Sequence, residues 1–213
     1  MTTYYKATRV DGTDFYTGII DYGAALVSGE VIRHPAKRVR NEPATYLSVS
    51  VDAANCTGFS WPCRLFRVEP VGRVMANLHA SSSKRALSAL RVVEELPAHL
   101  ALGPNGERVA AFIERCKTLT KEQAKRLDAA WYAARDAVRY AARDAAWDAA
   151  GYAAWDAAGY AVRYAAGDAA RDAAWDSAGY AAWAMVVRDL ITTEQYAVLV
   201  RPFVDAGLGE WVA

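Results

Sequence analysis

Residues 131–186 read WYAA-RDAV-RYAA-RDAA-WDAA-GYAA-WDAA-GYAV-RYAA-GDAA-RDAA-WDSA-GYAA-WAMV, which is fourteen tetrads in a row. Each tetrad opens with Trp, Arg or Gly, continues with Tyr or Asp in all but the last, and closes with two residues that are nearly all Ala. Alanine is the best helix former, and β-branched residues are almost absent from the stretch. Because no proline lies between Pro104 and Pro202, we expect one helix from about residue 120 to about residue 190. At ~1.5 Å per residue this helix would be about 105 Å long.

Polar residues at both ends of this stretch are placed to cap helices. Thr120 is followed three residues later by Gln123, which is the capping-box spacing that starts a helix. Thr192 or Thr193 is placed to start a further helix in the same way. The sequence therefore predicts a helix boundary close to residue 120 and another close to residue 192.

The four-residue period of the repeat predicts how the helix packs. Four residues turn an α-helix by about 400°, so each tetrad advances its alanine stripe by about 40°, in the right-handed sense. Glycines on a four-residue row let two helix backbones approach closely. Such a row is formed by Gly151, Gly159, Gly167 and Gly179.

The aromatic side chains of the repeat need an apolar partner, because each buries on the order of 150–250 Å² when packed. We therefore expect self-association of the helix into a bundle or coiled coil, hence a homo-oligomer. A solvated single helix and an internal hairpin broken at a bare glycine are the alternatives. The expected interface adds to the four glycines the aromatic residues Trp147, Trp155, Trp175, Trp183, Tyr152 and Tyr160.

The N-terminal part has the pattern of short strands separated by turns. Aromatic and β-branched residues or alternating polarity mark the expected strands, and Asp11-Gly12 and Ser28-Gly29 mark turns. A helix over 83–95 is predicted because Leu87, Leu90 and Val93 are spaced for one buried face. The expected strands cover 4–8, 14–16, 30–33, 46–51 and 64–69.

These patterns divide the chain. Six of its seven prolines lie at or before Pro104, which separates the strand-rich part from the helical part. The predicted fold class is α+β, with a small β-rich domain followed by the long alanine-rich helix. The expected segments are a small α+β domain over 1–80, a helical connector over 81–119, the tetrad-repeat helix over 120–190 and a C-terminal helical cap over 191–213.

Composition limits the classes of protein to consider. The chain has 213 residues, of which 54% are apolar and 23% are charged, with a net charge of +1. Such a chain is not disordered, and bulk charge does not favour binding to nucleic acid. The polar start Met1 to Lys6 has no apolar core, and no apolar run approaches the ~18 residues that span a bilayer. We expect a cytoplasmic protein that does not enter membranes.

Residues that could carry chemistry are few. Cys56 and Cys63 are seven positions apart, with His34 and His79 on either side, but zinc sites favour two to four residues between cysteines. A Cys56–Cys63 disulfide is an alternative, although a reducing cytoplasm opposes it. We expect buried thiols, and we expect Cys116 to lie on a helix with its side chain in the hydrophobic core. No motif calls for a metal or a cofactor.

A short basic segment is a candidate contact for an anion or a partner. It consists of Arg33, Lys37, Arg38 and Arg40, next to His34. Clustered cations attract phosphate groups. No aromatic residue or glycine-rich cradle accompanies the segment, and a solvated loop is the alternative.

Three residues on successive expected strands suggest a further alternative, an enzyme. Arg9, Ser48 and Glu69 loosely resemble the site of ADP-ribosyltransferases. In those enzymes the position two residues before the glutamate usually carries an acidic or amide residue, whereas this chain has Arg67. No P-loop, nucleophile elbow or Rossmann glycine pattern is present.

Several stretches together resemble a known group of sequences. They are YYKAT at 4–8, YLSVS at 46–50, CTGFSWPCRLFRVEP at 56–70, the tetrads, and LITTEQY at 190–196. With these, most of the chain resembles uncharacterised alanine-rich proteins of actinobacteria and their phages. The resemblance brings no known activity or site residue, and it implies a role linked to a phage or mobile element.

The leading functional expectation is a non-enzymatic, self-assembling structural protein that displays its N-terminal domain, as a virion component would. The second is a binding module that captures a host protein or a small ligand, as a phage counter-defence factor would. The third is an enzyme of the ADP-ribosyltransferase type. Solution mass and the identity of co-purifying molecules distinguish the first two.

Overall fold

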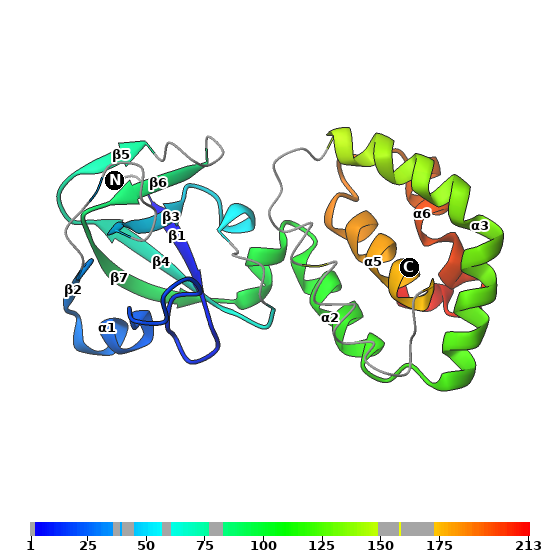
Figure 1. Cartoon of the computed structure of the whole chain (residues 1–213), viewed down its shortest axis with the longest axis horizontal. Helices are drawn as coiled ribbons and strands as arrows, with labels where there is room; N and C mark the ends of the chain where they lie inside the picture. The colour runs from blue at the N-terminus through cyan, green and yellow to red at the C-terminus, as the bar shows by residue number, and fades with distance from the viewer. Residues whose placement is uncertain are drawn as a thin grey trace. The chain divides into compact units, whose positions relative to one another are not determined.

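A computed structural model describes residues 3–35, 39, 45–56, 61–76, 83–148, 158 and 173–213. The chain forms two compact units, Met1–Gly103 and Pro104–Ala213, which are described separately below (Figure 1). The division falls next to Pro104. The first unit contains the strands and the second contains the long helices.

The N-terminal unit is built on one antiparallel sheet of seven strands, which runs in the order β2-β7-β4-β1-β3-β6-β5 (Figure 1). The longest strands, β4 and β7, lie side by side, and β1 follows β4. The strands are β1 Tyr4–Thr8, β2 Val31–Arg33, β3 Leu47–Ser50, β4 Arg64–Pro70, β5 Val74–Ala76, β6 Lys84–Leu87 and β7 Ala89–Leu96.

Two apolar clusters cover the two faces of this sheet. One contains Phe66 and Val68 of β4 and is closed by helix α1 (Tyr22–Ser28), whose Tyr22 ring stacks on Phe66 at 6.5 Å. The other contains Ala7 and Leu65, and the short helices η2 (Ala53–Asn55) and η3 (Ala98–Leu102) pack over it. The sheet is therefore the middle layer of the unit.

The junction between β1 and β3 positions the site described below. Among the described residues, these neighbouring strands pair only through Tyr5 and Ser50, whereas β1 and β4 pair along the whole of β1. Beyond that single pair the carbonyl of Ser48 accepts a hydrogen bond from the Lys6 side chain instead, at 3.2 Å. The ladder is thus open between two central strands, and side chains from both sheet faces reach the opening.

Most of the expected strands are confirmed, and two expectations are wrong. Strands occur at 4–8, 31–33, 47–50 and 64–70, close to the predicted ranges. Residues 14–16 do not form a strand; they form a turn that Asp14 holds with its carboxylate. The helix predicted over 83–95 is wrong, because this segment forms β6 and β7. Sheet pairing buries Leu90 and Val92, which alternate along β7.

The C-terminal unit contains four α-helices and a short 3₁₀ turn among its described residues. Helix α3 runs along both α5 and α6, and α5 also contacts α2 (Figure 1). Phe112 of α2 packs edge-on against Phe203 of α6, with ring centroids 5.2 Å apart. The elements are α2 Gly106–Cys116, α3 Lys121–Asp148, α5 Ala173–Val186, α6 Thr193–Asp205 and η5 Gly209–Trp211.

The single long helix predicted over 120–190 is wrong. The rings of Trp131 in α3 and Tyr180 in α5 stack with centroids 5.2 Å apart. A continuous helix would separate these positions by about 73 Å, at 1.5 Å per residue. The chain therefore reverses direction between α3 and α5, and the two alanine-rich helices pack on each other within one unit. The longest described helix, α3, has 28 residues.

Both predicted capping sites are confirmed. The Thr120 amide donates to Gln123 Oε1 at 2.9 Å, and the Gln123 amide donates to Thr120 Oγ1 at 3.2 Å. The same reciprocal pair joins Thr192 and Gln195 at the start of α6, at 2.8 and 3.1 Å. None of the described helices combines the length and the low polarity that crossing a membrane requires.

The capping box of α6 makes a stability prediction. Thr192→Ala is expected to lower the free energy of unfolding by about 1 kcal/mol, because the Gln195 amide loses its acceptor at the helix start. Thr193→Ala is the matched control, since Thr193 is exposed and is the first helical residue rather than the cap. Urea denaturation of the two variants measures the difference, and equal midpoints would contradict the assignment of Thr192 as the cap.

Candidate functional site: a lysine cavity at the open ladder

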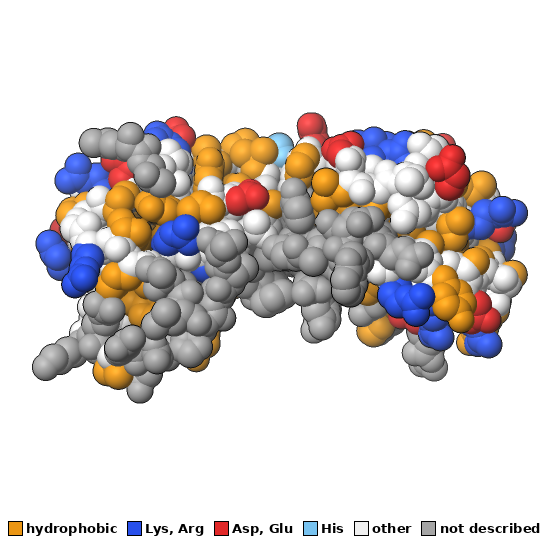
Figure 2. Space-filling view, turned by 90° about the horizontal axis from the view of Figure 1, so that it is seen from above, with side chains coloured by type: hydrophobic (Ala, Val, Ile, Leu, Met, Phe, Trp, Pro, Cys, Tyr) orange, Lys and Arg blue, Asp and Glu red, His pale blue; other side chains and the backbone are white. Residues whose placement is uncertain are grey.

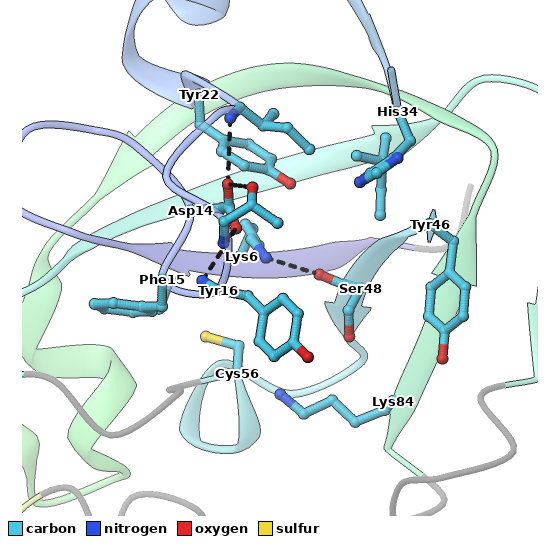
Figure 3. A pocket seen from close by; sticks show the side chains of 14 residues that line it. Lys6, Asp14, Phe15, Tyr16, Tyr22, His34, Tyr46, Ser48, Cys56 and Lys84 are labelled. Carbon is cyan, nitrogen blue, oxygen red and sulfur yellow. Dashed lines mark hydrogen bonds between the residues drawn. The ribbon is translucent and has the colours of Figure 1, made fainter. Parts of the chain in front are cut away.

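A cavity of about 350 Å³ lies at the opening between β1 and β3 (Figure 3). Side chains from β1, from the loop before α1, from α1 itself and from β6 line it. Figure 3 shows polar groups from these elements turned toward one space. The residues that carry its chemistry are Lys6, Asp14, Tyr22, Cys56 and Lys84, together with the backbone of Ser48.

Lys6 places an amine inside this cavity. The Lys6 side chain starts from β1, donates to the Ser48 carbonyl at 3.2 Å, and holds its Nζ atom 5.3 Å from the centre of the Tyr22 ring. Burial disfavours the charged form of the amine, and the neighbouring Lys84 adds repulsion. Asp14 acts in the opposite sense but does not prevail, and the pKa of Lys6 falls from 10.5 to about 8.

Asp14 forms the wall of the cavity beside Lys6 and fixes the loop that precedes α1. Its Oδ1 accepts from the amides of Tyr16 and Thr17 at 3.0 and 2.7 Å. Its Oδ2 accepts from the Thr17 hydroxyl at 2.7 Å and from the Ile20 amide at 3.2 Å. Burial raises the pKa of Asp14, but the hydrogen bonds from Thr17 and Ile20 outweigh it, so the pKa lies below its ordinary value.

Tyr22 brings a buried polar atom to the lining. The residue is fully buried, and within the part of the chain that the structure describes its hydroxyl has no hydrogen-bond partner. Burial raises the pKa of this phenol, so the hydroxyl keeps its proton. A buried hydroxyl that bonds to nothing is costly, and such a group calls for an explanation. Tyr22 is one of the residues that line the cavity.

Lys84 and Cys56 complete the polar lining. Lys84 projects from β6 and is half-buried, and burial lowers its pKa. The Cys56 thiol donates to the Ala53 carbonyl at 3.0 Å, and burial raises its pKa to about 11. At neutral pH the thiol is therefore protonated. Neither Lys84 nor Lys6 forms an ion pair with a carboxylate in the part of the chain that the structure describes.

Aromatic side chains form the rest of the lining. Phe15 and Tyr16 come from the loop before α1, and Tyr46 comes from the residue before β3 (Figure 3). Tyr16 is 77% exposed, so its ring stands at the edge of the site rather than in the core. His34 lines the side near β2. The cavity thus combines two amines with the aromatic ring of Tyr16 beside them (Figure 3).

The three cysteines are buried free thiols, as the sequence predicts. Burial raises the pKa of Cys63 and of Cys116 to about 12. Within the described residues, no group of three metal-ligating side chains is close enough to hold an ion. His79 lies outside the described residues.

The basic segment is described only in part. Arg33 ends β2 and is exposed, whereas Lys37, Arg38 and Arg40 lie outside the described residues. On the face drawn in Figure 2, the described Lys and Arg side chains of each unit stand in several separate groups among acidic and apolar ones. The expected anion contact at this segment stays a prediction.

The three residues that suggested an ADP-ribosyltransferase site are not brought together. Glu69 lies one residue beyond the Tyr4–Val68 pair, and Arg9 lies just beyond the opposite end of β1. That places the two roughly 20 Å apart along the strand. Glu69 faces Arg67 at 3.8 Å instead.

The expected oligomer interface is mostly outside the described part of the chain. Gly151, Gly159, Gly167, Trp155, Tyr152 and Tyr160 lie there, and so does the side chain of Trp147. Gly179 is buried inside the helical unit. Trp183 packs edge-on against Tyr180 with centroids 4.8 Å apart, whereas Trp175 is 40% exposed.

Sequence reasoning missed the lysine cavity. Lys6 and Lys84 are 78 positions apart, and each stands in an ordinary strand pattern with no motif around it. The only local signal is the Asp14–Thr17 spacing, which is typical of a side chain that holds a turn. Comparisons with family models, with curated proteins and with solved structures give no match, so the cavity itself is the basis for a functional argument.

Proposed function

We propose that the N-terminal unit is a binding module for a small organic anion with an aromatic or otherwise flat apolar body. The observation that carries the proposal is that two lysines line one cavity without a carboxylate to pair either of them among the described residues. This function belongs to the second class expected from the sequence, a module that captures a small ligand.

Electrostatics supports an anion as the ligand. Lys6 and Lys84 repel each other, and burial penalises the charge of each. The Asp14 carboxylate accepts four hydrogen bonds from Tyr16, Thr17 and Ile20. It therefore offsets the positive charge of Lys6 only from a distance. An anion between the two amines would relieve the repulsion and would gain charge-assisted hydrogen bonds.

The shape and the lining of the cavity support the apolar body. A volume of about 350 Å³ lies at the lower end of the range for small-molecule sites, which excludes a macromolecular ligand from the interior. The ring of Tyr16 lies among Lys6, Cys56 and Lys84 and offers a flat surface on which such a body would pack (Figure 3).

The self-assembly expected from the repeat has a weaker basis than this site. Its main argument was that the aromatic residues of a long helix need a partner. In the helical unit Trp131 is already buried against Tyr180 of the same chain. A partner helix from another copy is therefore not required for these two rings.

Calorimetric titration of the full chain tests the proposal with two nearly isosteric probes. Benzoate is expected to bind and its neutral counterpart benzamide is not, because only benzoate carries a negative charge to pair with the amines of Lys6 and Lys84. Lys84→Met is expected to raise the Kd of benzoate about tenfold, the effect of losing one charge-assisted contact.

Lys121→Met is the matched control, because it removes the same charge from an exposed position in the other unit. The Kd of benzoate should not change in this variant. Equal binding of benzoate and benzamide, or equal effects of the two lysine variants, would show that the cavity does not select an anion.

A further inference from the structure

The geometry points to Lys6 as a nucleophile that captures its ligand covalently and reversibly. We infer that the Lys6 amine forms an imine with the carbonyl group of an anionic aldehyde or 2-oxo acid held in the cavity. This inference rests on the proposed function, since the anionic group is what the second lysine would hold. It adds the carbonyl chemistry and the residue that bonds to it.

The placement of the Lys6 amine suits attack on a bound molecule. The amine faces the cavity and, among the described residues, donates one hydrogen bond, to the Ser48 carbonyl. That carbonyl fixes the direction of the side chain. It does not neutralise the charge of the amine, whereas a carboxylate partner would. On another side the amine lies 5.3 Å from the centre of the Tyr22 ring, so an aromatic face rather than a carboxylate stands there.

The protonation state of Lys6 supports the same role, because only a neutral amine attacks a carbonyl group. With a pKa of about 8, roughly a fifth of the Lys6 side chains are neutral at pH 7.4. About one in a thousand ordinary lysines is neutral at that pH. A lysine activated by burial and by a second cation nearby is a known route to imine chemistry.

The step balances without an oxidant or a reductant. The Lys6 nitrogen forms a bond to the carbonyl carbon while the carbonyl π bond breaks, and the oxygen takes a proton to give a carbinolamine. The hydroxyl group then leaves as water, the nitrogen loses its second hydrogen, and a carbon–nitrogen double bond remains. Aldehyde and amine thus give imine and water.

One neighbouring side chain is assigned to this exchange of protons. The Tyr22 hydroxyl keeps its proton and has no acceptor among the described residues, so it is the donor for the carbonyl oxygen. Lys84 holds the anionic group of the ligand, and the bond forms at Lys6.

Cys56 is the competing nucleophile in the cavity, and its state argues against it. Its thiol donates to the Ala53 carbonyl and has a pKa of about 11, so the reactive thiolate is scarce at neutral pH. A thiol also adds to an aldehyde without forming an imine. Reduction by cyanoborohydride therefore distinguishes the two, because it traps only the carbon–nitrogen double bond.

The experiment treats the full chain with 4-carboxybenzaldehyde and sodium cyanoborohydride at pH 7.4, followed by peptide mass mapping of the time course. This probe carries an aldehyde on a benzoate body. The Lys6 peptide is expected to gain one carboxybenzyl group at least about tenfold faster than the Lys121 peptide, because of its larger neutral fraction. Benzoate should slow the labelling of Lys6 and leave that of Lys121 unchanged.

Variants separate the nucleophile from its charge. Lys6→Arg keeps a cation and should abolish the fast labelling, and circular dichroism checks that the variant folds. Lys84→Met should slow the labelling of Lys6 without abolishing it. Mapping on the unmodified chain requires no variant, so equal labelling of all lysines, or fast labelling at Lys84 instead of Lys6, overturns the inference.

The benzoate titration and the trapping experiment together also distinguish this inference from the proposed function. Benzoate binding without preferential trapping at Lys6 overturns the nucleophile and leaves the anion site standing. Fast trapping at Lys6 that benzoate does not slow overturns the anion site and leaves the reactive lysine. Failure of both benzoate binding and trapping overturns both.

Discussion

Replacing Trp131 by alanine is expected to lower the free energy of unfolding of the helical unit by about 3–5 kcal/mol, the usual cost of truncating a buried tryptophan. Trp131 is 2% exposed and its ring stacks on Tyr180 of α5 at 5.2 Å. The substitution removes this contact and leaves a cavity between α3 and α5. Chemical denaturation followed by circular dichroism at 222 nm measures the loss.

The neighbouring residue provides the control for this prediction. Tyr132 stands one position further along α3 and is 63% exposed, so Tyr132→Ala should change stability by less than about 1 kcal/mol. Comparable losses in the two variants would mean that α3 presents a different face to α5. The result would then contradict the reversal of the chain between these helices.

Replacing Asp14 by alanine is expected to cost the N-terminal unit about 3 kcal/mol. The carboxylate accepts four hydrogen bonds, and the substitution leaves the buried Ile20 amide and the Thr17 amide without their acceptor. The loop that walls the lysine cavity should loosen as a result, and benzoate affinity should fall with it. Thermal unfolding and the titration described above measure the two effects.

Asp11 in the same loop is the matched control, and pH gives an independent check. Asp11 is exposed and accepts only from the Thr13 amide and hydroxyl, so Asp11→Ala should cost about 1 kcal/mol or less. The pKa of Asp14 lies below its ordinary value in the folded chain, so its contribution is complete at neutral pH and is lost as pH falls below the usual carboxylate range. The gap between Asp14→Ala and the unmodified chain should therefore shrink on acidification.

Local pattern was enough to predict the strands that alternate cleanly, and it misled where two periods overlap. The expected strand at 46–51 alternates apolar and polar residues, and β3 forms there. In the segment predicted as a helix, Leu87, Leu90 and Val93 fit a helical face, but Leu90 and Val92 also fit a strand face. Pairing with β4 and β2 decided between these readings, and no short window of sequence contains that information.

The tetrad repeat shows a different limit. Its composition predicts helix correctly for α3 and α5, because alanine favours helix in any context. A uniform repeat does not indicate where the chain reverses, since every tetrad resembles the next. The contact between Trp131 and Tyr180 joins the first position of one tetrad to the second position of another, and the period does not indicate which tetrads meet.

The lysine cavity was beyond sequence reasoning for a topological reason. Lys6 and Lys84 belong to strands that are separated by β3 in the sheet, and they meet because β1 and β3 pair through a single described residue pair. The hydropathy pattern describes each strand alone. It does not show whether two neighbouring strands pair along their whole length. The buried Tyr22 hydroxyl likewise appears in the sequence as an ordinary helix residue.

The lengths of the strands bear on how the sheet avoids contact with other chains. Its two outermost strands, β2 and β5, have three residues each, whereas the inner β4 and β7 have seven and eight. An outer strand exposes unpaired backbone groups that can recruit a foreign strand, and very short borders offer few of them. Arg33 adds an exposed charge to one border. Extending β2 or β5 by a few β-branched residues should therefore make the sheet more prone to aggregation.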